Sequence, residues 1–380
     1  MTERERFLAA FEGKATDRPP AYEQAFASDV ASEILGREAH TGSVMLHYQE
    51  AVAAVKGPEA YRDFRKRMER DVVDLARALR LGAVAGPWTI GPPTKQVGEY
   101  EFLYGDPEGD WAVYRYDPDS GTYGPVQYNR KPAWRGREAL KARVDEAWRG
   151  AEMWAEEERE EFTRHILHWR ELVGEELEVL GRGAGLSVPL NEEWLTACAL
   201  APDLVGEYLD AQVERARQQL EAQAELGVRI VWGGGDLADN RGPIYGQRVF
   251  REIVLPRLKR IVGYAHKLGL KYVFRSDGDL WSIAEELFGK SGVDGYGEID
   301  HDAGMRIPEV QERFPKLTCW GNVSSRLLRR GRPEQVKDAV RELIEKALPM
   351  GRWILGSSNT ILPKTPVENV LAMYEAAGLI

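Results

Sequence analysis

Short apolar segments that run directly into polar residues and glycine recur in the last third of this chain. They are Lys271–Gly278 (KYVFRSDG), Leu317–Val323 (LTCWGNV) and Trp353–Thr360 (WILGSSNT). Helix-like segments separate them, so strands and helices alternate, and this alternation predicts a parallel sheet with helices outside it. We therefore expect an α/β fold, a (β/α)8 TIM barrel, with its chemistry on the loops that follow the strands.

The rest of the chain contains the other strands that a barrel requires. In chain order, the eight expected strands fall within Arg18–Phe26, Leu81–Gly86, Leu177–Leu180, Val228–Trp232, Leu270–Phe274, Gly295–Glu298, Leu317–Trp320 and Trp353–Leu355. Helices are expected at Glu3–Glu12 and Glu334–Ala347, among other places, from their apolar periodicity. We interpret residues 1–380 as a single barrel domain.

The segment between Gly98 and Asn129 has a different composition from its surroundings. Its aromatic and polar residues are broken by turn signals (YEFLYGDPEGDWAVYRYDPDSGTYG), which is typical of hairpins. We interpret residues 98–129 as an antiparallel hairpin insertion in the barrel.

Charge and cysteine content narrow the classes of partner. The chain has 51 basic and 61 acidic side chains, a formal charge of -10, which disfavours binding to nucleic acid or to anionic membranes. Cys198 and Cys319 are far apart and form neither a disulfide framework nor a CxxC metal site. No apolar run approaches the roughly 18 residues of a membrane span. We expect a cytoplasmic protein.

Two carboxylates follow the expected fourth strand, in the sequence GGGDLAD. The glycines allow close approach of the backbone, so Asp236 and Asp239 could face a ligand or a cation, with Trp232 lining the same pocket. The alternative is a glycine-rich turn in which Asp239 caps the next helix.

After the fifth strand, Arg275 stands beside the carboxylate of Asp277. An arginine at this place can bind a substrate carboxylate or can neutralise Asp236 and Asp277. We favour a role in the site, because charged groups packed this closely are costly unless they are paired or used. The alternative is a structural ion pair at the rim.

The sixth strand ends in the sequence EIDHD, which places His301 between carboxylates. By residue type, His301 and Glu298 are candidates for a general acid or base or for metal ligands. A solvated loop or a helix start is the competing interpretation.

Neutral hydrogen-bonding groups follow the last two strands. Asn322, Ser357, Ser358 and Asn359 suit recognition of a polar substrate, and the alternative is that they are turn or capping residues. Another motif, Gly181–Gly185 (GRGAG), resembles a loose phosphate loop but lacks the Lys-Ser/Thr ending, so it is weak evidence for a nucleotide.

Three long segments together resemble the uroporphyrinogen decarboxylase superfamily. They are the opening RERFLAAFEGKATDRPP, the middle GGGDLADNRGPIYGQRVFREIVLPRLKRIVGYAHKLGLKYVFRSDGD, and the ending GNVSSRLLRRGRPEQVKDAVRELIEKA with WILGSSNTILPKTPVENVLAMYEAA. The similarity covers nearly the whole chain, and the fold that it implies is a (β/α)8 barrel.

The resemblance also shows where this chain departs from the decarboxylases. Those enzymes carry an arginine-rich segment after the first strand and an aspartate after the second. Here Ala21–Asp29 (AYEQAFASD) has no arginine and Ala83–Trp88 (AVAGPW) has no acid. Decarboxylation of uroporphyrinogen itself is therefore disfavoured.

The methyltransferase branch of the superfamily is closer, through the Gly-Asp-x-x-Asp sequence at Gly235–Asp239. Its zinc-dependent members use a His-x-Cys pair after the fifth strand and a Cys after the eighth. Arg275, Asp277 and Ser357–Asn359 stand at those positions, so the thiolate zinc site is absent. Oxygen and nitrogen ligands remain that could hold a metal: Asp236, Asp277, Glu298 and His301.

The resemblance implies transfer of a methyl group from a small methoxylated or methylated substrate to cob(I)alamin carried by a partner corrinoid protein. His301, Glu298 or a bound cation would assist the leaving group. Two alternatives remain open: a lyase acting on a carboxylated small molecule with Arg275 as the carboxylate clamp, and a non-catalytic small-molecule-binding barrel.

Overall fold

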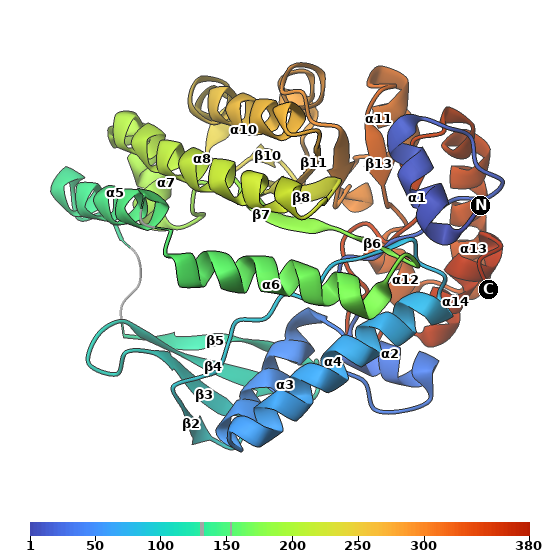
Figure 1. The fold of residues 1–380 in the computed structure, drawn as a ribbon, viewed down its shortest axis with the longest axis horizontal. Helices are drawn as coiled ribbons and strands as arrows, with labels where there is room; N and C mark the ends of the chain where they lie inside the picture. The colour runs from blue at the N-terminus through green and yellow to red at the C-terminus, as the bar shows by residue number, and fades with distance from the viewer. Residues whose placement is uncertain (130–132, 153) are drawn as a thin grey trace.

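The computed structural model describes residues 1–129, 133–152 and 154–380, and its centre is a parallel sheet surrounded by helices (Figure 1). Six strands of this sheet lie in the order β14-β13-β12-β11-β8-β7. Their bounds are β7 Gly181–Gly185, β8 Ile230–Gly234, β11 Lys271–Arg275, β12 Gly295–Gly297, β13 Thr318–Trp320 and β14 Trp353–Ile354. The predicted α/β class is confirmed.

Both edges of this sheet continue through further backbone hydrogen bonds. At one edge, β6 (Glu178–Val179) directly precedes β7 and is paired in parallel with β1 (Ala83–Val84). At the other edge, the Tyr22 amide donates to the Leu355 carbonyl at 3.0 Å. The segment around Ala21 is joined to β1 in turn, because the Gly82 amide donates to the Ala21 carbonyl at 2.9 Å.

Helices follow most of the parallel strands. The α-helices are α1 Glu3–Glu12, α2 Ser28–Leu35, α3 Ser43–Val55, α4 Pro58–Ala78, α5 Arg137–Glu152, α6 Glu156–Val173, α7 Glu192–Leu200, α8 Pro202–Glu225, α9 Gly246–Val249, α10 Leu255–Lys267, α11 Ile307–Arg313, α12 Ser325–Arg330, α13 Pro333–Lys346 and α14 Val367–Ala376. Helix α13 illustrates the sequence logic: Pro333 opens it, and Val336, Val340 and Leu343 form its buried face. Within the described residues, no helix is long and apolar enough to cross a membrane.

The expected hairpins form a separate four-stranded antiparallel sheet that lies beside α3 (Figure 1). Its strands are β2 Lys95–Gly98, β3 Glu101–Gly105, β4 Trp111–Asp117 and β5 Thr122–Tyr128. Tyrosines join this sheet to α3: the ring of Tyr48 stacks on that of Tyr116 with 3.9 Å between centroids. The sheet begins at Lys95, slightly before the predicted boundary.

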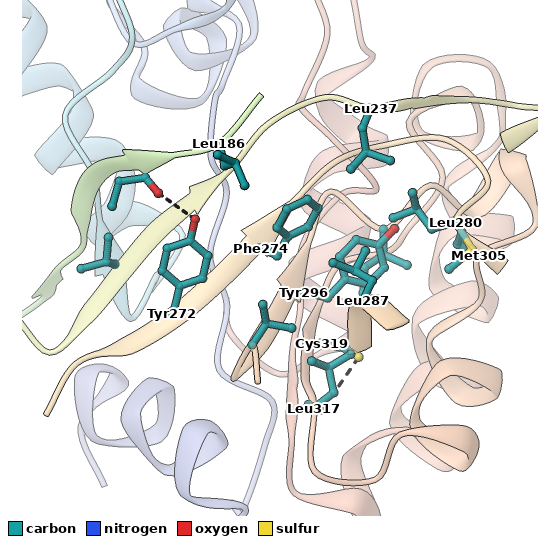
Figure 2. Packing of buried hydrophobic residues seen from close by; sticks show 14 of the residues in the cluster. Leu186, Leu237, Tyr272, Phe274, Leu280, Leu287, Tyr296, Met305, Leu317 and Cys319 are labelled. Carbon is teal, nitrogen blue, oxygen red and sulfur yellow. Dashed lines mark hydrogen bonds between the residues drawn. The ribbon is translucent and has the colours of Figure 1, made fainter. Parts of the chain in front are cut away.

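The parallel strands bury apolar side chains on both faces. Ile230, Trp232 and Val273 belong to an inner cluster with Tyr22 and Trp320. Alternate residues of the same strands face the helices, and Figure 2 shows Tyr272, Phe274, Tyr296 and Cys319 in that outer layer. Because successive side chains of a strand point to opposite faces, the inner face continues at the strand ends with Arg182 after Leu180 and Arg275 after Val273.

A few shorter elements complete the chain. A two-stranded hairpin, β9 (Ala238–Asp239) with β10 (Gly242–Pro243), follows β8. A short 3₁₀ turn at His301–Ala303 follows β12.

Candidate functional site

Arg275 and Glu298 form an ion pair at the ends of β11 and β12. The Arg275 Nη1 atom donates to Glu298 Oε1 at 3.2 Å. The Glu298 side chain is 5% exposed and that of Arg275 is 39% exposed, so a buried carboxyl meets a cation that keeps part of its hydration. Glu298 also has a left-handed backbone, with φ at 59°, which is uncommon for a residue with a side chain and is found repeatedly at functional sites.

The surroundings of Glu298 favour its protonated form. Burial raises the pKa of the Glu298 carboxyl, and the charges of Asp236 and Asp277 raise this pKa further, while Arg275 and a hydrogen bond from Gln24 oppose the shift. A carboxyl with a raised pKa can deliver a proton to a group that gains negative charge. Glu298 is therefore a buried carboxyl whose pKa is raised in spite of the arginine beside it.

A chain of hydrogen bonds connects three other polar side chains beside this pair. The Asn359 amide donates to Asp277 Oδ2 at 3.2 Å, and the Gln24 amide donates to Asn359 Oδ1 at 3.2 Å. Burial raises the pKa of Asp277, and the charges of Asp236 and Asp300 add to this effect. The structure thus brings the predicted residues Asp277 and Asn359 together, and it adds Gln24, whose only sequence signal is its place at the end of the first expected strand.

The backbone of the glycine-rich turn packs closely on Arg275. Gly234 has φ at 87°, and a Cβ atom there would lie 2.5 Å from the Arg275 nitrogen. The Tyr272 hydroxyl accepts from the Gly234 amide at 2.9 Å and donates to the Ala184 carbonyl at 2.8 Å, the bond drawn from Tyr272 in Figure 2. This tyrosine fixes the ends of three neighbouring strands relative to one another.

The two predicted aspartates after β8 have different surroundings. Asp236 is exposed, and its charge contributes to the raised pKa values of Asp277 and Glu298. Asp239 lies in the small hairpin that follows β8, where its carboxylate accepts from the Arg241 amide at 2.7 Å and pairs with the Arg241 side chain at 3.2 Å. Trp232 is buried against Tyr22 and Trp320 in the inner cluster, beneath the charged residues.

His301 is not joined to Glu298 by any hydrogen bond or ion pair among the described residues. Its Nδ1 atom is buried without a hydrogen-bond partner, and it lies 3.8 Å from Oδ1 of the adjacent Asp302. Lys346 lowers the pKa of Glu342 on α13 most strongly, and the charges of Arg306 and then His301 lower this pKa further. The histidine therefore lies close enough to this helix to influence one of its carboxylates.

Three of the predicted neutral groups make hydrogen bonds that do not involve Arg275 or Glu298. The Asn322 amide donates to the Met305 carbonyl at 2.6 Å. The Ser358 hydroxyl accepts from the Ser325 amide at 3.1 Å, at the start of α12. Ser357 donates to a glutamate that sequence reasoning missed, Glu23, through both its amide at 2.6 Å and its hydroxyl at 2.7 Å.

Glu23 is a second carboxyl with a strongly perturbed acidity. Burial raises the pKa of Glu23 to about 8, against the opposing hydrogen bonds from Ser357. It directly follows Tyr22, so the signal in the sequence was an acid at the end of the first strand. Its neighbour Tyr22 faces the inner cluster, which places Glu23 on the opposite, helix-facing side.

With this geometry established, comparison with known proteins identifies the family. A model of the family described as uroporphyrinogen decarboxylase (URO-D) matches residues 187–378, just over half of the 380-residue chain. The chain belongs to the uroporphyrinogen decarboxylase family. The match contains β8, β11, β12, β13 and β14, whose ends carry most of the site.

One curated protein and one solved structure are similar to this URO-D family chain at different levels. The uroporphyrinogen decarboxylase of Dichelobacter nodosus is 26% identical over 157 residues, which are 41% of this chain and 43% of that protein. The match thus spans less than half the length of this curated relative. A solved methyltransferase from Methanosarcina mazei covers 100% of this chain and 98% of its own, with a TM-score of 0.63 at 19% identity, and shows a shared fold.

Potential metal ligands do not cluster in the described part of this URO-D family member. Within residues 1–129, 133–152 and 154–380, no three His, Cys, Asp or Glu side chains converge as a metal site would require. Both thiols are buried, and burial raises the pKa of Cys198 to about 11. The oxygen and nitrogen ligands considered from the sequence therefore do not assemble into such a group.

Proposed function

We propose that this protein is a methyltransferase that removes a methyl group from a small methoxylated or methylated substrate and transfers it to cob(I)alamin on a separate corrinoid protein. The observation that carries this proposal is the buried Glu298 carboxyl, whose pKa is raised although Arg275 lies beside it. A demethylated oxygen or nitrogen needs a proton as it leaves, and this carboxyl is placed to supply one.

The proposed reaction balances with an external acceptor. The bond between the methyl carbon and the substrate oxygen or nitrogen breaks, its electron pair stays on that atom, and the Glu298 proton joins it. The corrinoid supplies the strong nucleophile that takes the methyl group. Among the described residues, the polar side chains around Glu298 are an arginine, amides and carboxylates. None of these groups is a strong nucleophile, which supports a methyl acceptor from outside the chain.

The loops on this side of the sheet provide apolar contacts for a partner. Trp88 follows β1, Leu190 follows β7 and Ile244 follows the β9–β10 hairpin after β8, and all three side chains are exposed, Trp88 by 68%. Because the carboxyl ends of parallel strands lie on one side of a sheet, we place these residues on the same side as Arg275 and Glu298. A corrinoid protein would dock over them.

We also propose that the parallel strands close into a (β/α)8 barrel within one domain, residues 1–380, with the antiparallel sheet as its insertion. Two observations support closure: the hydrogen bonds that join Leu355 to Tyr22, Ala21 to Gly82 and Val84 to Leu180, and the whole-chain similarity to the Methanosarcina mazei methyltransferase.

A lyase reaction on a carboxylated molecule is the second candidate. Two arginines, Arg182 and Arg275, continue the inner face at the strand ends, which favours an acidic substrate. In that reaction the carbon–carbon bond would break, carbon dioxide would leave, and the carbanion would take the Glu298 proton.

One assay separates the two candidates. The purified protein is incubated with cob(I)alamin, as a stand-in for the corrinoid protein, and with methylamines or methoxylated aromatic compounds, including methoxylated carboxylic acids that either reaction could use. We expect loss of the cob(I)alamin absorption with an equimolar amount of demethylated product, and much slower loss with Glu298→Gln. The exposed Glu312→Gln is the matched control. Release of carbon dioxide without demethylation would instead establish the lyase.

A further inference from the structure

Arg182 is a second cation at the same end of the parallel strands as Arg275. It follows Leu180, which belongs to the inner cluster, and its backbone is in register with Trp232 of that cluster. Arg275 follows Val273, which is in register with the same Trp232. Both arginines therefore extend from the inner face of the sheet, on either side of β8.

The two arginines differ in their partners. Arg275 is paired with Glu298, whereas Arg182 has no hydrogen bond and no ion pair anywhere in the part of the chain that the structure describes. Its side chain is half-buried, and burial lowers the pKa of Arg182. A guanidinium that has lost part of its hydration without gaining a hydrogen-bond acceptor destabilises the folded protein. A ligand that supplies the acceptor would therefore gain binding free energy.

A β-bulge immediately after Arg182 holds the strand end in an unusual conformation. Arg182 pairs with Trp232 and Gly185 with Gly234, so β7 has one residue more than β8 between these pairs. Within this bulge, Ala184 lies in the left-handed region, with φ at 50°. Bulges of this kind re-aim side chains and are frequent beside active sites.

Side chains from two other elements stabilise the bulge. The Ala184 amide donates to Gln219 Oε1 of α8 at 2.7 Å, and the Ala184 carbonyl accepts from the Tyr272 hydroxyl at 2.8 Å. The fold therefore maintains a strained backbone next to an unpaired cation, which indicates that the direction of the Arg182 side chain matters.

Tyr22 and Arg182 both adjoin Trp232 on the inner face of the sheet. The ring centroids of Tyr22 and Trp232 lie 5.1 Å apart, and the backbone of Arg182 is in register with Trp232. The Tyr22 hydroxyl, like the Arg182 guanidinium, has no hydrogen-bond partner among the described residues. A hydroxyl donor and a guanidinium donor are thus left free in the same region.

We propose that Arg182 and the Tyr22 hydroxyl bind a carboxylate of the substrate, so that the methyl donor is a methoxylated or methylated carboxylic acid. This inference rests on the proposed function and names its substrate class. The ligand is a monoanion, because Arg182 is the one cation of this cluster without a partner among the described residues, and because the nearby charge of Asp236 would repel a dianion.

Binding measurements without turnover test this assignment. Isothermal titration calorimetry compares 4-methoxybenzoate with 4-methoxybenzamide, and methoxyacetate with methoxyacetamide, which differ in charge and little in shape. The wild-type protein should bind each carboxylate about ten-fold or more tightly than its amide. Arg182→Gln should lose this preference, Arg182→Lys should retain part of it, and the exposed Arg248→Gln should leave it unchanged.

Labelling with phenylglyoxal provides a readout that needs no variant. Because Arg182 is unpaired, it should react, and 4-methoxybenzoate should protect it while 4-methoxybenzamide should not, as measured by peptide mass spectrometry. The assignment is overturned if no carboxylate of the series binds, if the amides bind equally well, if Arg182→Gln keeps the preference, or if inorganic phosphate binds more tightly than the carboxylates. Demethylation of neutral methoxy compounds alone would preserve the proposed function and reject this substrate class.

Discussion

Arg275 and Glu298 join the ends of two neighbouring parallel strands through a hydrogen bond of 3.2 Å. The pair is asymmetric, because the carboxyl is almost completely buried while the guanidinium keeps contact with solvent. Burial of Glu298 outweighs the attraction to Arg275, so the net effect is a raised pKa. The arginine therefore orients the acid without fixing it in the ionised form, and this is the property that a proton donor requires.

Replacing Glu298 by glutamine tests the proton donor directly. The new side chain in the Glu298→Gln variant would keep a carbonyl oxygen for Arg275 but would have no acidic proton. We expect kcat to fall by about 10² to 10⁴-fold, the usual contribution of general acid catalysis, while Tm changes little.

The exposed Glu312→Gln variant should keep wild-type kcat, which controls for the same substitution outside the site. Full activity in Glu298→Gln would exclude this carboxyl as the acid. A collapse of Tm in that variant would instead indicate that the pair is mainly structural.

Glu23 predicts a specific dependence of stability on pH. Its pKa is about 8 in the folded protein, whereas an unfolded glutamate has a pKa of about 4.3. Between these values the folded state binds a proton that the unfolded state lacks. The stabilisation is therefore fully present below about pH 4.3 and is lost as the pH rises through about 8, by at most about 1.4 kcal/mol per pH unit.

Urea unfolding at several pH values between 5.5 and 8.5 measures this effect. The Glu23→Gln variant lacks this titrating group, so its free energy of unfolding should fall less steeply with rising pH than that of the wild type, by the contribution of one proton. Its stability relative to the wild type should therefore improve as the pH rises. The exposed Glu108→Gln should keep the wild-type slope. Equal slopes in all three proteins would show that Glu23 is ionised throughout this range.

Much of the fold could be predicted from local patterns. Helix α1 has the predicted bounds, Glu3–Glu12, and strand β13 at Thr318–Trp320 lies within the predicted Leu317–Trp320. Both depend on residues close in sequence, whose period matches the element that they form. Local patterns do not determine the order of the strands, because strand pairing joins residues far apart in the chain. That order could be expected only from the general handedness of such folds.

The site could be predicted in part for the same reason. Arg275, Glu298 and Asp277 stand at strand ends, and that position together with their residue types suggested their role. Gln24 was missed because its partner, Asn359, is 335 residues away in sequence. Arg182 was hidden in a glycine-rich motif, since nothing in the sequence shows that a cation has no partner.

Tyr272→Phe tests the bridge between β7, β8 and β11. The hydroxyl that it removes bonds to the Gly234 amide and to the Ala184 carbonyl, both in buried surroundings. Leaving these two backbone groups without a partner should cost about 1–3 kcal/mol of unfolding free energy, measured in urea. Activity should also fall, because the bulge beside Arg182 would lose one of its supports.

The control for this variant is Tyr264→Phe on α10. Its hydroxyl makes no hydrogen bond within the described residues, and its ring contacts Lys267 through a face that the change preserves. Stability equal to the wild type is expected there. If Tyr272→Phe also left the free energy of unfolding unchanged, the Tyr272 hydroxyl could not be what holds the three strand ends together.

Gly234→Ala and Gly246→Ala separate backbone strain from steric conflict. Both glycines are left-handed, with φ at 87° and 83°. A Cβ at Gly246 meets no atom within 4 Å, so its substitution should cost about 1–2 kcal/mol from strain alone. A Cβ at Gly234 would lie 2.5 Å from the Arg275 nitrogen and 2.7 Å from its carbonyl oxygen, which adds about 1–3 kcal/mol of overpacking. Urea unfolding of the two variants measures the difference.

The same pair of variants connects the glycine-rich turn to ligand binding. Gly234 is in register with Gly185, at the end of the bulge beside Arg182. Because relief of the conflict at Gly234 must move this backbone, Gly234→Ala should also weaken binding of the carboxylate probes, whereas Gly246→Ala should not. Equal stability and equal binding in the two variants would show that the turn can shift without disturbing Arg182, and would separate this turn from the site.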